Sequence, residues 1–549
     1  MKVLAICLNS KFIHSSLAPW CISAGINEFC KENISVAVYE STINIDTEKI
    51  VDEILSEKAD IAAFSCYIWN ITKTLEICRI LKERSNIVLA LGGPEVCYRE
   101  KNILSEYLFI DFVLRGEGEW CFSKFADTFY CKGELSLVSG LTYRENDEII
   151  SVPEKFYTDT PPSPYCDEYF NSLNGRIAYI EASRGCPFSC SYCLSGRLDK
   201  VRFFEFERTK NALIQFSENR VKTVKFIDRT FNASERHAYQ ILEFIKENYH
   251  RFFDYGVRFH FEISADILTD KLICVLSEMP EGLIQLEAGI QTFNKNTATA
   301  INRRSDSKKL EKNLLRLISL RNIHIHTDLI AGLPYEDINS FAVGFNRAFS
   351  MRPHMLQLGF LKLLYGTKMR DAADSFAKSF SAEPPYEIKE TLTMSYEDIL
   401  KLKHCEAALE RMYNSGRFLL TTDYLLDCLE LTAFELFCEI GSATGLESVE
   451  LYKFVEVIYN TFMHRCDWEK LREKLLCDLI STDVNIKVPA ELKKYEPEYK
   501  TVKKHFSEKF GENIKLVLLN NATQAYIVKR SDKKNLYNRY EGRILKTGF

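Results

Sequence analysis

Several features that would assign a function directly are missing from this sequence. It has no Gly-x-Gly-x-x-Gly fingerprint, which argues against a nicotinamide site. No signal peptide opens it, and no apolar run approaches the length of a membrane span. Repeats and low-complexity segments are also absent. These absences favour a cytoplasmic protein that has no membrane partner.

A charge excess of one sign is missing as well. The 549 residues carry 71 Lys and Arg against 76 Asp and Glu, a net charge of −5, so no global basic field argues for nucleic acid. Lysines between Lys493 and Lys546 alternate with acidic residues, which is more typical of a solvated face than of an RNA site. The 18 cysteines are scattered, many of them in apolar runs, and indicate buried thiols in a reducing compartment. The length predicts two to four domains.

Three cysteines stand apart from the others. Cys186, Cys190 and Cys193 follow a strand-like run at residues 176–182 directly, and in a reducing chain their spacing indicates a bound cluster. A zinc site would need a fourth Cys or His, and none follows within the next ten residues. Three ligands fit a [4Fe–4S] cluster that leaves one iron open. Three unconnected thiols are the alternative interpretation.

The first 150 residues alternate between strand and helix patterns, which predicts an α/β fold with a doubly wound, Rossmann-like parallel sheet. Predicted strands cover residues 2–8, 34–39, 61–65, 87–91 and 109–114, and helices cover 17–30, 48–56 and 72–83. Ligands of such sheets bind beyond the carboxyl ends of the strands. The loops there supply the candidates Ser10, Ser65, Tyr67, Asn70, Gly92, Gly93, Pro94, Glu95, Gly116 and Glu117. For any single loop, ordinary turn residues are the competing interpretation.

A second series of strand and helix patterns follows. Its strands are predicted at 176–182, 223–228, 257–263, 283–288, 323–329 and 355–361. Six units are too few to close a barrel of eight, and the reactive face of such a barrel is where the strands end. The last third reads as mostly helical, with a strand pair at 514–519 and 524–528.

The Cys-x3-Cys-x2-Cys pattern, with Tyr192 before its last cysteine, resembles the radical S-adenosylmethionine (SAM) enzymes, whose fold is a partial (β/α)6 TIM-type barrel. The loops at 92–95 and 115–119 resemble the cobalamin-binding domain that precedes this barrel in one large subfamily. The Asp-x-His-x-x-Gly motif, which gives cobalt a histidine in many cobalamin proteins, is missing. His14 does not replace it, so the resemblance implies cobalamin without a lower ligand from the protein.

The resemblance also assigns residues around SAM. The segment 286–292 is similar to the family's Glu-x-Gly-x-Gln-Ser, and 328–334 matches its Asp-Leu-Ile-x-Gly-Leu-Pro. The implied SAM-binding residues are Tyr192, Asp228, Glu262, Glu287, Gln291, Arg303 and Leu333. For Glu262 and Arg303 a surface ion pair is an equal alternative. His260, His324 and His326 are predicted to be structural.

The implied domains are a cobalamin-binding domain at 1–150, a linker at 151–170, a radical SAM barrel at 171–375 and a helical domain of unknown role at 376–549. The implied activity is formation of a 5′-deoxyadenosyl radical and methylation of an unactivated carbon. Its partners would be a small-molecule or peptide substrate and a reductant such as flavodoxin or ferredoxin. Alternatives are oxidative cyclisation or rearrangement without methyl transfer, methylthio transfer to tRNA, and a non-catalytic cobalamin or redox sensor. The tRNA class has additional cluster cysteines in its N-terminal domain, and Cys7, Cys21 and Cys66 lack their contexts.

Overall fold

The computed structural model describes residues 1–197, 200–254, 256–482, 488–493, 496–530, 532 and 534–547, apart from the side chains of Arg197 and Phe253. The chain divides into two compact units. The first comprises Met1–Gln285, Ile301–Arg304 and Lys362–Ile388. The second comprises Leu286–Ala300, Ser305–Leu361 and Lys389–Phe549.

The first unit begins with the predicted doubly wound sheet. Its described strands are β1 (Lys2–Asn9), β2 (Ser35–Thr42), β3 (Ile61–Ser65), β4 (Val88–Gly92), β5 (Phe112–Leu114), β6 (Leu141–Glu145) and β7 (Glu148–Ser151). They are ordered β2-β1-β3-β4-β5-β6-β7; β1 to β5 are parallel, and the β6–β7 hairpin is antiparallel. Because the order reverses direction at β1, a crevice opens between the ends of β1 and β3, where such folds bind ligands.

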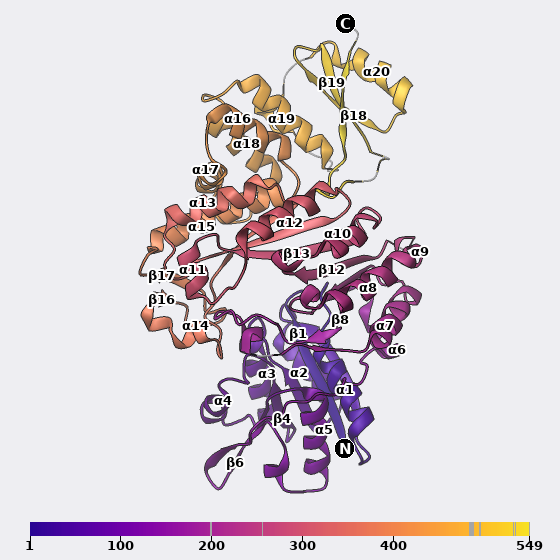
Figure 1. The fold of residues 1–549 in the computed structure, drawn as a ribbon, viewed down its shortest axis with the longest axis vertical. Coiled ribbons are helices and arrows are strands. Elements are labelled where there is room, and N and C mark those ends of the chain that lie inside the picture. Colours follow the sequence, from indigo (N-terminus) through magenta and orange to yellow (C-terminus); the bar gives the residue numbers. More distant parts are fainter. Residues whose placement is uncertain are drawn as a thin grey trace. The chain divides into compact units, whose positions relative to one another are not determined.

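Helices cover both faces of this sheet (Figure 1). They are α1 (Ala18–Phe29), α2 (Thr47–Ser56), α3 (Ile71–Arg84), α4 (Glu100–Glu106) and α5 (Gly118–Tyr130). The sequence did not predict α4 or α5. Glycines at 116 and 118 have low helix propensity and weaken the helical pattern where α5 begins, although its buried Cys121, Phe122 and Phe125 have helical spacing. The loop after β5 is therefore shorter than expected.

The six strands predicted for the barrel are all found, in the order β15-β14-β13-β12-β11-β8. The first unit holds β8 (Ala178–Ile180), β11 (Thr223–Phe226) and β12 (Arg258–Ile263), which are parallel, with α6 (Asp167–Leu173), α7 (Phe206–Glu218), α8 (Glu235–Glu247), α9 (Tyr249–Phe253) and α10 (Asp270–Ser277). The next elements are β13 (Ile284–Gln291), α11 (Lys295–Ala300), α12 (Ser307–Ser319), β14 (His324–Ala331), α13 (Ile338–Ser350) and β15 (Met355–Phe360), and β14 and β15 pair in parallel. Strand β8 is shorter than predicted because a two-residue ladder, β9 (Ser183–Arg184) with β10 (Arg202–Phe203), takes over after it.

The remainder is mostly helical, as predicted. Its elements are α14 (Lys368–Asp371), β16 (Ala377–Phe380), β17 (Ile388–Thr391), α15 (Tyr396–Leu409), α16 (Leu419–Leu429), α17 (Ala433–Thr444), α18 (Leu451–Phe462), α19 (Trp468–Ser481) and α20 (Tyr499–Phe510). Helix α15 was predicted to reach Tyr413 but passes into a π-helical turn at Glu410. The expected strand pair is an antiparallel sheet of β18 (Ile514–Leu519), β19 (Gln524–Lys529) and β20 (Gly542–Lys546). None of the helices in the described part of the chain is both long and apolar enough to span a bilayer.

Candidate functional site: a thiol loop and a cavity in the first unit

The three cysteines lie on the loop that leaves β9. Within it the Cys193 amide donates to the Cys190 carbonyl at 3.1 Å, and the Gly196 amide donates to the Cys193 carbonyl at 3.2 Å. A Cβ on Gly196 would lie 2.8 Å from the Cys190 carbonyl oxygen, so only glycine fits there without a shift. The sequence around the last cysteine is therefore fitted to a tight coil of the backbone.

Two segments from much later in the chain hold this loop. The Ser191 amide donates to the Ile301 carbonyl at 2.9 Å, and the Ser191 carbonyl accepts from the Met369 amide at 2.9 Å. The Asn302 side-chain amide donates to the carbonyl and the hydroxyl of Ser189, at 3.0 and 2.7 Å. The loop is thus fixed by long-range hydrogen bonds.

The surroundings of the thiols suit thiolate ligands. Cys190 is 7% exposed, and burial raises the pKa of its thiol, but the Arg303 guanidinium, 4.0 Å from Sγ, opposes that shift by stabilising the thiolate. Among the described residues only Glu287, His326 and Asp328 place three potential ligand atoms within 4.8 Å of one another. The three thiols are therefore more widely spread than one tetrahedral ion requires, and this soft donor set fits an iron–sulfur cluster.

A cavity of about 760 Å³ opens at the carboxyl ends of the first sheet. Every lining residue belongs to the first unit. One wall comes from the loops after β1, β3, β4 and β5, and the other from the ends of β8, β11 and β12. The predicted residues that line it are Ser10, Ser65, Tyr67, Gly92, Gly93, Gly116 and Glu117. Glu262, predicted for SAM, also lines it, 4.0 Å from the Lys225 ammonium.

Asn70, Pro94 and Glu95 were predicted in the same loops but are not among the lining residues. The Asn70 side chain closes the turn after β3, where it accepts from the Tyr67 amide at 2.7 Å and donates to the carbonyls of Leu8 and Ser65. Glu95 is buried, accepts from the Tyr386 hydroxyl and pairs with Arg99 at 3.1 Å. These two side chains support the loops from within the protein.

The shape of the first wall has local causes. Gly93 has φ +101°, and a Cβ there would lie 2.6 Å from the Cys66 carbonyl oxygen, so glycine is required by the packing of the two loops. Tyr67 and Trp69 stack with centroids 4.5 Å apart, and both line the cavity. His14 lines it too, with Nδ1 2.7 Å from the Tyr179 hydroxyl, and burial lowers the pKa of its imidazole. A wide, glycine-edged and partly aromatic cavity fits a large flat ligand such as cobalamin.

Three SAM candidates of the first unit, Tyr192, Asp228 and Arg303, lie on the thiol loop or contact it or the segment before it. Tyr192 and Arg303 interact electrostatically with Cys190. Asp228 is 1% exposed; one oxygen accepts from the Ala182 amide at 3.0 Å and the other from the Ser183 hydroxyl at 2.5 Å. Burial raises the pKa of Asp228 to about 7. This carboxyl braces the segment that leads into the thiol loop.

The remaining SAM candidates lie in the second unit. Glu287 lies on β13, 3.9 Å from the His326 Nδ1, while His326 Nε2 is 3.0 Å from Asp328 on β14. Gln291 ends β13 with φ +68°, and Leu333 is fully buried. His326, predicted to be structural, therefore lies between two carboxylates, an arrangement that could hold a metal ion.

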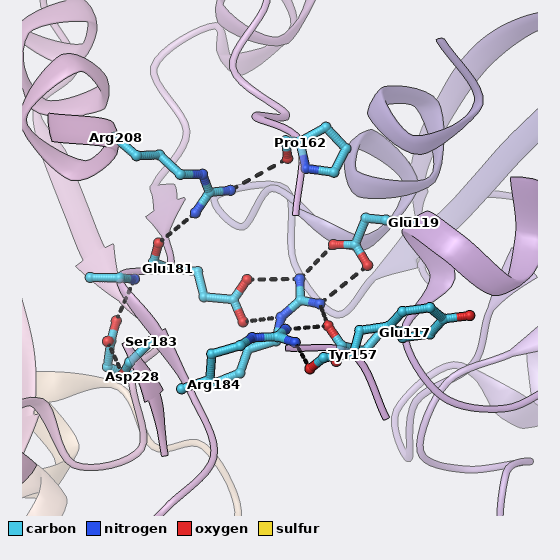
Figure 2. A network of polar contacts seen from close by, with 11 residues as sticks. Glu117, Glu119, Tyr157, Pro162, Glu181, Ser183, Arg184, Arg208 and Asp228 are labelled. Carbon is cyan, nitrogen blue, oxygen red and sulfur yellow. Dashed lines mark hydrogen bonds and ion pairs between the residues drawn. The ribbon is translucent and has the colours of Figure 1, made fainter. Parts of the chain in front are cut away.

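A charged network that the sequence analysis missed joins the two walls of the cavity (Figure 2). The Arg184 guanidinium pairs with Glu119 at 2.5 Å, with Glu181 at 2.7 Å and with Glu117. Arg202 also pairs with Glu117, at 2.5 Å. The repeated acids in Arg-Gly-Glu-Gly-Glu and the position of Arg184 two residues before Cys186 were the available signals.

Family comparisons agree with this architecture. Residues 4–126 match the B12 binding domain, residues 180–343 match the radical SAM superfamily, and residues 374–544 match a protein family of unknown function, DUF4080. The chain thus combines a B12 binding domain with a radical SAM domain. Cobalamin, SAM and a [4Fe–4S] cluster are the cofactors of these domains.

Individual proteins are also similar to this chain. The cobalamin-dependent radical SAM methyltransferase TokK of Streptomyces tokunonensis is 27% identical over 321 residues, which are 52% of this chain and 44% of TokK, so the chain spans less than half of that relative. The anaerobic magnesium-protoporphyrin IX monomethyl ester cyclase of Rubrivivax gelatinosus is 23% identical over 57% of this chain and 58% of the cyclase. The structure of the cobalamin-dependent SAM radical enzyme OxsB with aqua-cobalamin and SAM bound has a TM-score of 0.64, 13% identity, and coverage of 92% of this chain and 84% of OxsB. This last likeness shows the shared fold.

Proposed function

We propose that this protein is a cobalamin-dependent radical SAM enzyme that methylates an unactivated carbon of its substrate. The observation that carries the proposal is the 760 Å³ cavity, one wall of which comes from the B12 binding domain and the other from the barrel strands β8, β11 and β12. The thiol loop begins two residues after Arg184, which lines that cavity. A methyl carrier and a radical generator would therefore serve one cavity.

Residues take the following roles in this proposal. Cys186, Cys190 and Cys193 hold the cluster, and Arg303 balances the charge of the Cys190 thiolate. The residues proposed to bind SAM are Tyr192, Asp228, Glu262, Glu287, Gln291 and Leu333. The residues that contact cobalamin are Ser10, Ser65, Tyr67, Gly92, Gly93, Gly116 and Glu117, and Asn70 and Glu95 support their loops.

When bound, the cofactors supply one-electron cleavage of the SAM sulfonium and a carrier for the methyl group. The chain's own part is to orient them and exclude water. The hydrogen bonds from Ser191, Asn302 and Met369 keep the thiol loop in one geometry. Stacked Tyr67 and Trp69 give the first wall an apolar surface on which a flat ring can lie.

The test is anaerobic reconstitution with iron, sulfide and hydroxocobalamin, followed by incubation with SAM that carries a labelled methyl group and a low-potential reductant. We expect 5′-deoxyadenosine, a cobalamin spectrum, and transfer of label to products from candidate substrates. Formation of 5′-deoxyadenosine without label in any product would contradict methyl transfer. Absence of both 5′-deoxyadenosine and cobalamin would contradict the whole proposal.

Oxidative cyclisation without methyl transfer is the second candidate. It is favoured by the similarity to the Rubrivivax cyclase, which extends over more of this chain than the TokK alignment does. In the same assay a cyclase would form 5′-deoxyadenosine and consume substrate, but its product would have lost hydrogen and gained no label.

A further inference from the structure

Every N–H donor of the Arg184 guanidinium is used in hydrogen bonds to carboxylates from two separate segments of the chain. The guanidinium donates five hydrogen bonds: two to Glu181, at 2.7 and 2.9 Å, two to Glu119, at 3.2 and 2.5 Å, and one to Glu117. Five is the full donor capacity of a guanidinium. Glu181 belongs to its own segment, whereas Glu117 and Glu119 lie 67 and 65 positions earlier, at the start of α5.

Each end of this network is anchored separately. The Glu181 carbonyl accepts from Arg208 at 3.4 Å, and Asp228 holds the amide of Ala182 and the hydroxyl of Ser183 (Figure 2). On the other side, a Cβ on Gly25 of α1 would lie 2.3 Å from the Glu119 carbonyl oxygen, so α1 and α5 are in backbone contact at this point. Arg184 therefore joins two rigid pieces.

The charged groups are buried to different depths: the side chains of Arg184 and Glu117 are 20% and 24% exposed, and that of Glu119 is 3% exposed. Although burial raises the pKa of the Glu119 carboxyl, Arg184 reverses that shift so that the pKa ends below its ordinary value. The carboxylates in turn raise the pKa of Arg184 against the effect of burial. Removal of one partner would leave uncompensated buried charge, which is costly. The network is therefore firm rather than a loose surface contact.

We propose that Arg184 is a positioning residue that fixes the cobalamin-side loop 116–119 relative to the cluster-bearing loop 186–193. Arg184, Glu117, Glu119 and Glu181 all line the cavity, and two positions separate Arg184 from Cys186. The inference rests on the proposed function for the identity of the two cofactors. The mechanical link itself follows from the five hydrogen bonds.

The experiment compares Arg184→Gln, Arg184→Lys and Glu119→Gln with wild type. Arg176→Gln is the matched control. Arg176 pairs with Glu40 at 2.9 Å and is buried to a similar depth, so this ion pair also joins two elements, β2 and the start of β8. Unlike Arg184, however, Arg176 lines a different pocket. We expect unchanged iron and sulfide per chain in the Arg184 variants. We expect the Kd for hydroxocobalamin to rise about 100-fold in Arg184→Gln and about tenfold in Arg184→Lys, since lysine cannot form the fork. The Kd of Glu119→Gln for hydroxocobalamin should fall between the values for the two Arg184 variants.

A spectroscopic readout separates positioning from simple loss of stability. In protein that carries both cofactors, the reduced cluster should shorten the electron-spin relaxation time of cob(II)alamin, both in wild type and in the Arg176→Gln control. That effect should weaken in Arg184→Gln at saturating cobalamin. A Kd within twofold of wild type, together with unchanged relaxation, would overturn the proposal.

Hydrogen exchange on cofactor-free protein distinguishes this failure from failure of the proposed function. Arg184→Gln should speed amide exchange in residues 112–121 and 182–190 together, whereas the control should speed it in 35–42. If wild type takes up no cobalamin, the proposed function fails while exchange still decides the mechanical link. Exchange in Arg184→Gln and Glu119→Gln that equals wild type in both segments would refute the link.

Discussion

The two walls of the cavity are built by different physical means. The wall from the first sheet depends on contacts within its own domain: Asn70 closes its turn on Tyr67 and Ser65 and donates to the Leu8 carbonyl, and Gly93 packs on Cys66. The wall from β8 and its neighbours depends on charges whose partners lie 65 and 67 positions away. The difference teaches that one wall can form as soon as its own domain folds, whereas the other is completed only when the two domains meet. The first two predictions below each perturb one part of the site while the other stays measurable, and the later ones test the residues that support it and the stability of the fold.

The largest effect is expected from replacement of Cys186, Cys190 and Cys193 by alanine together. Because these thiols are the proposed iron ligands, bound iron and sulfide should fall to background and 5′-deoxyadenosine should disappear. Cobalamin binding should persist because the first wall is untouched. Replacement of the exposed Cys131, Cys166 and Cys274 is the control and should leave iron content unchanged. Equal iron uptake by the two triple variants would refute the cluster assignment.

The next largest effect is expected from a substitution at a glycine of the first wall. Gly93→Ala forces a side chain into φ +101° and within 2.6 Å of the Cys66 carbonyl oxygen, and should cost about 3 kcal/mol or more. Gly175→Ala has a similar φ of +80° but no atom within 4 Å, and should cost only about 1 kcal/mol. Urea unfolding measures both. Equal costs would mean that the contact with Cys66 does not matter.

The brace at Asp228 predicts a pH effect on stability. Burial raises its pKa from 3.8 to about 7, so between pH 4 and pH 7 the folded chain binds a proton that the unfolded chain releases. Stability from this group is therefore full below pH 4 and is lost as the pH rises to 7, by up to about 1.4 kcal/mol per unit. Asp228→Asn should flatten the fall of the urea midpoint between pH 5 and pH 7. Burial also raises the pKa of Glu336 to about 7, so Glu336→Gln should by itself make the urea midpoint fall less between pH 5 and pH 7. Slopes equal to wild type in both variants would contradict the assignment.

The smallest effect is expected behind the first wall. Tyr386→Phe removes the hydroxyl that donates to the buried Glu95 and leaves that carboxylate with Arg99. The loss should be about 1–2 kcal/mol of unfolding free energy, with little change in iron content. Arg84→Gln, which breaks exposed ion pairs with Glu48 and Asp52, should cost less than about 0.5 kcal/mol. A Tyr386→Phe loss no larger than that would show that Glu95 is adequately paired without the hydroxyl.

The order and type of most elements could be predicted because apolar periodicity records which face of an element is buried. All six barrel strands and the five parallel strands of the first sheet were predicted, and β3 was predicted to the residue. Helix α5 was missed because Gly116 and Gly118, on either side of its N-cap Glu117, weaken the helical pattern where the helix begins. Strand β20 was missed because its burial is only partial, with Ile544 exposed.

The site could be predicted in part for a similar reason. Local motifs indicated Ser65, Tyr67, Gly92 and Gly93, which line the cavity. They did not single out Arg184, because its pairing with Glu119, 65 positions earlier, leaves no spacing pattern in a single sequence. His326 was predicted to be structural because Glu287, the carboxylate 3.9 Å away, is on another strand at no motif spacing.

The long-range grip on the thiol loop has a consequence for biosynthesis. A ribosome finishes Cys193 well before it makes Ile301 and Asn302, and longer still before Met369. Until those later stretches emerge, the three sulfurs lack the framework that sets their spacing. If these sulfurs hold the cluster as proposed, a chain truncated before residue 369 would have all three cysteines but lack part of that framework, and we expect it to retain iron poorly.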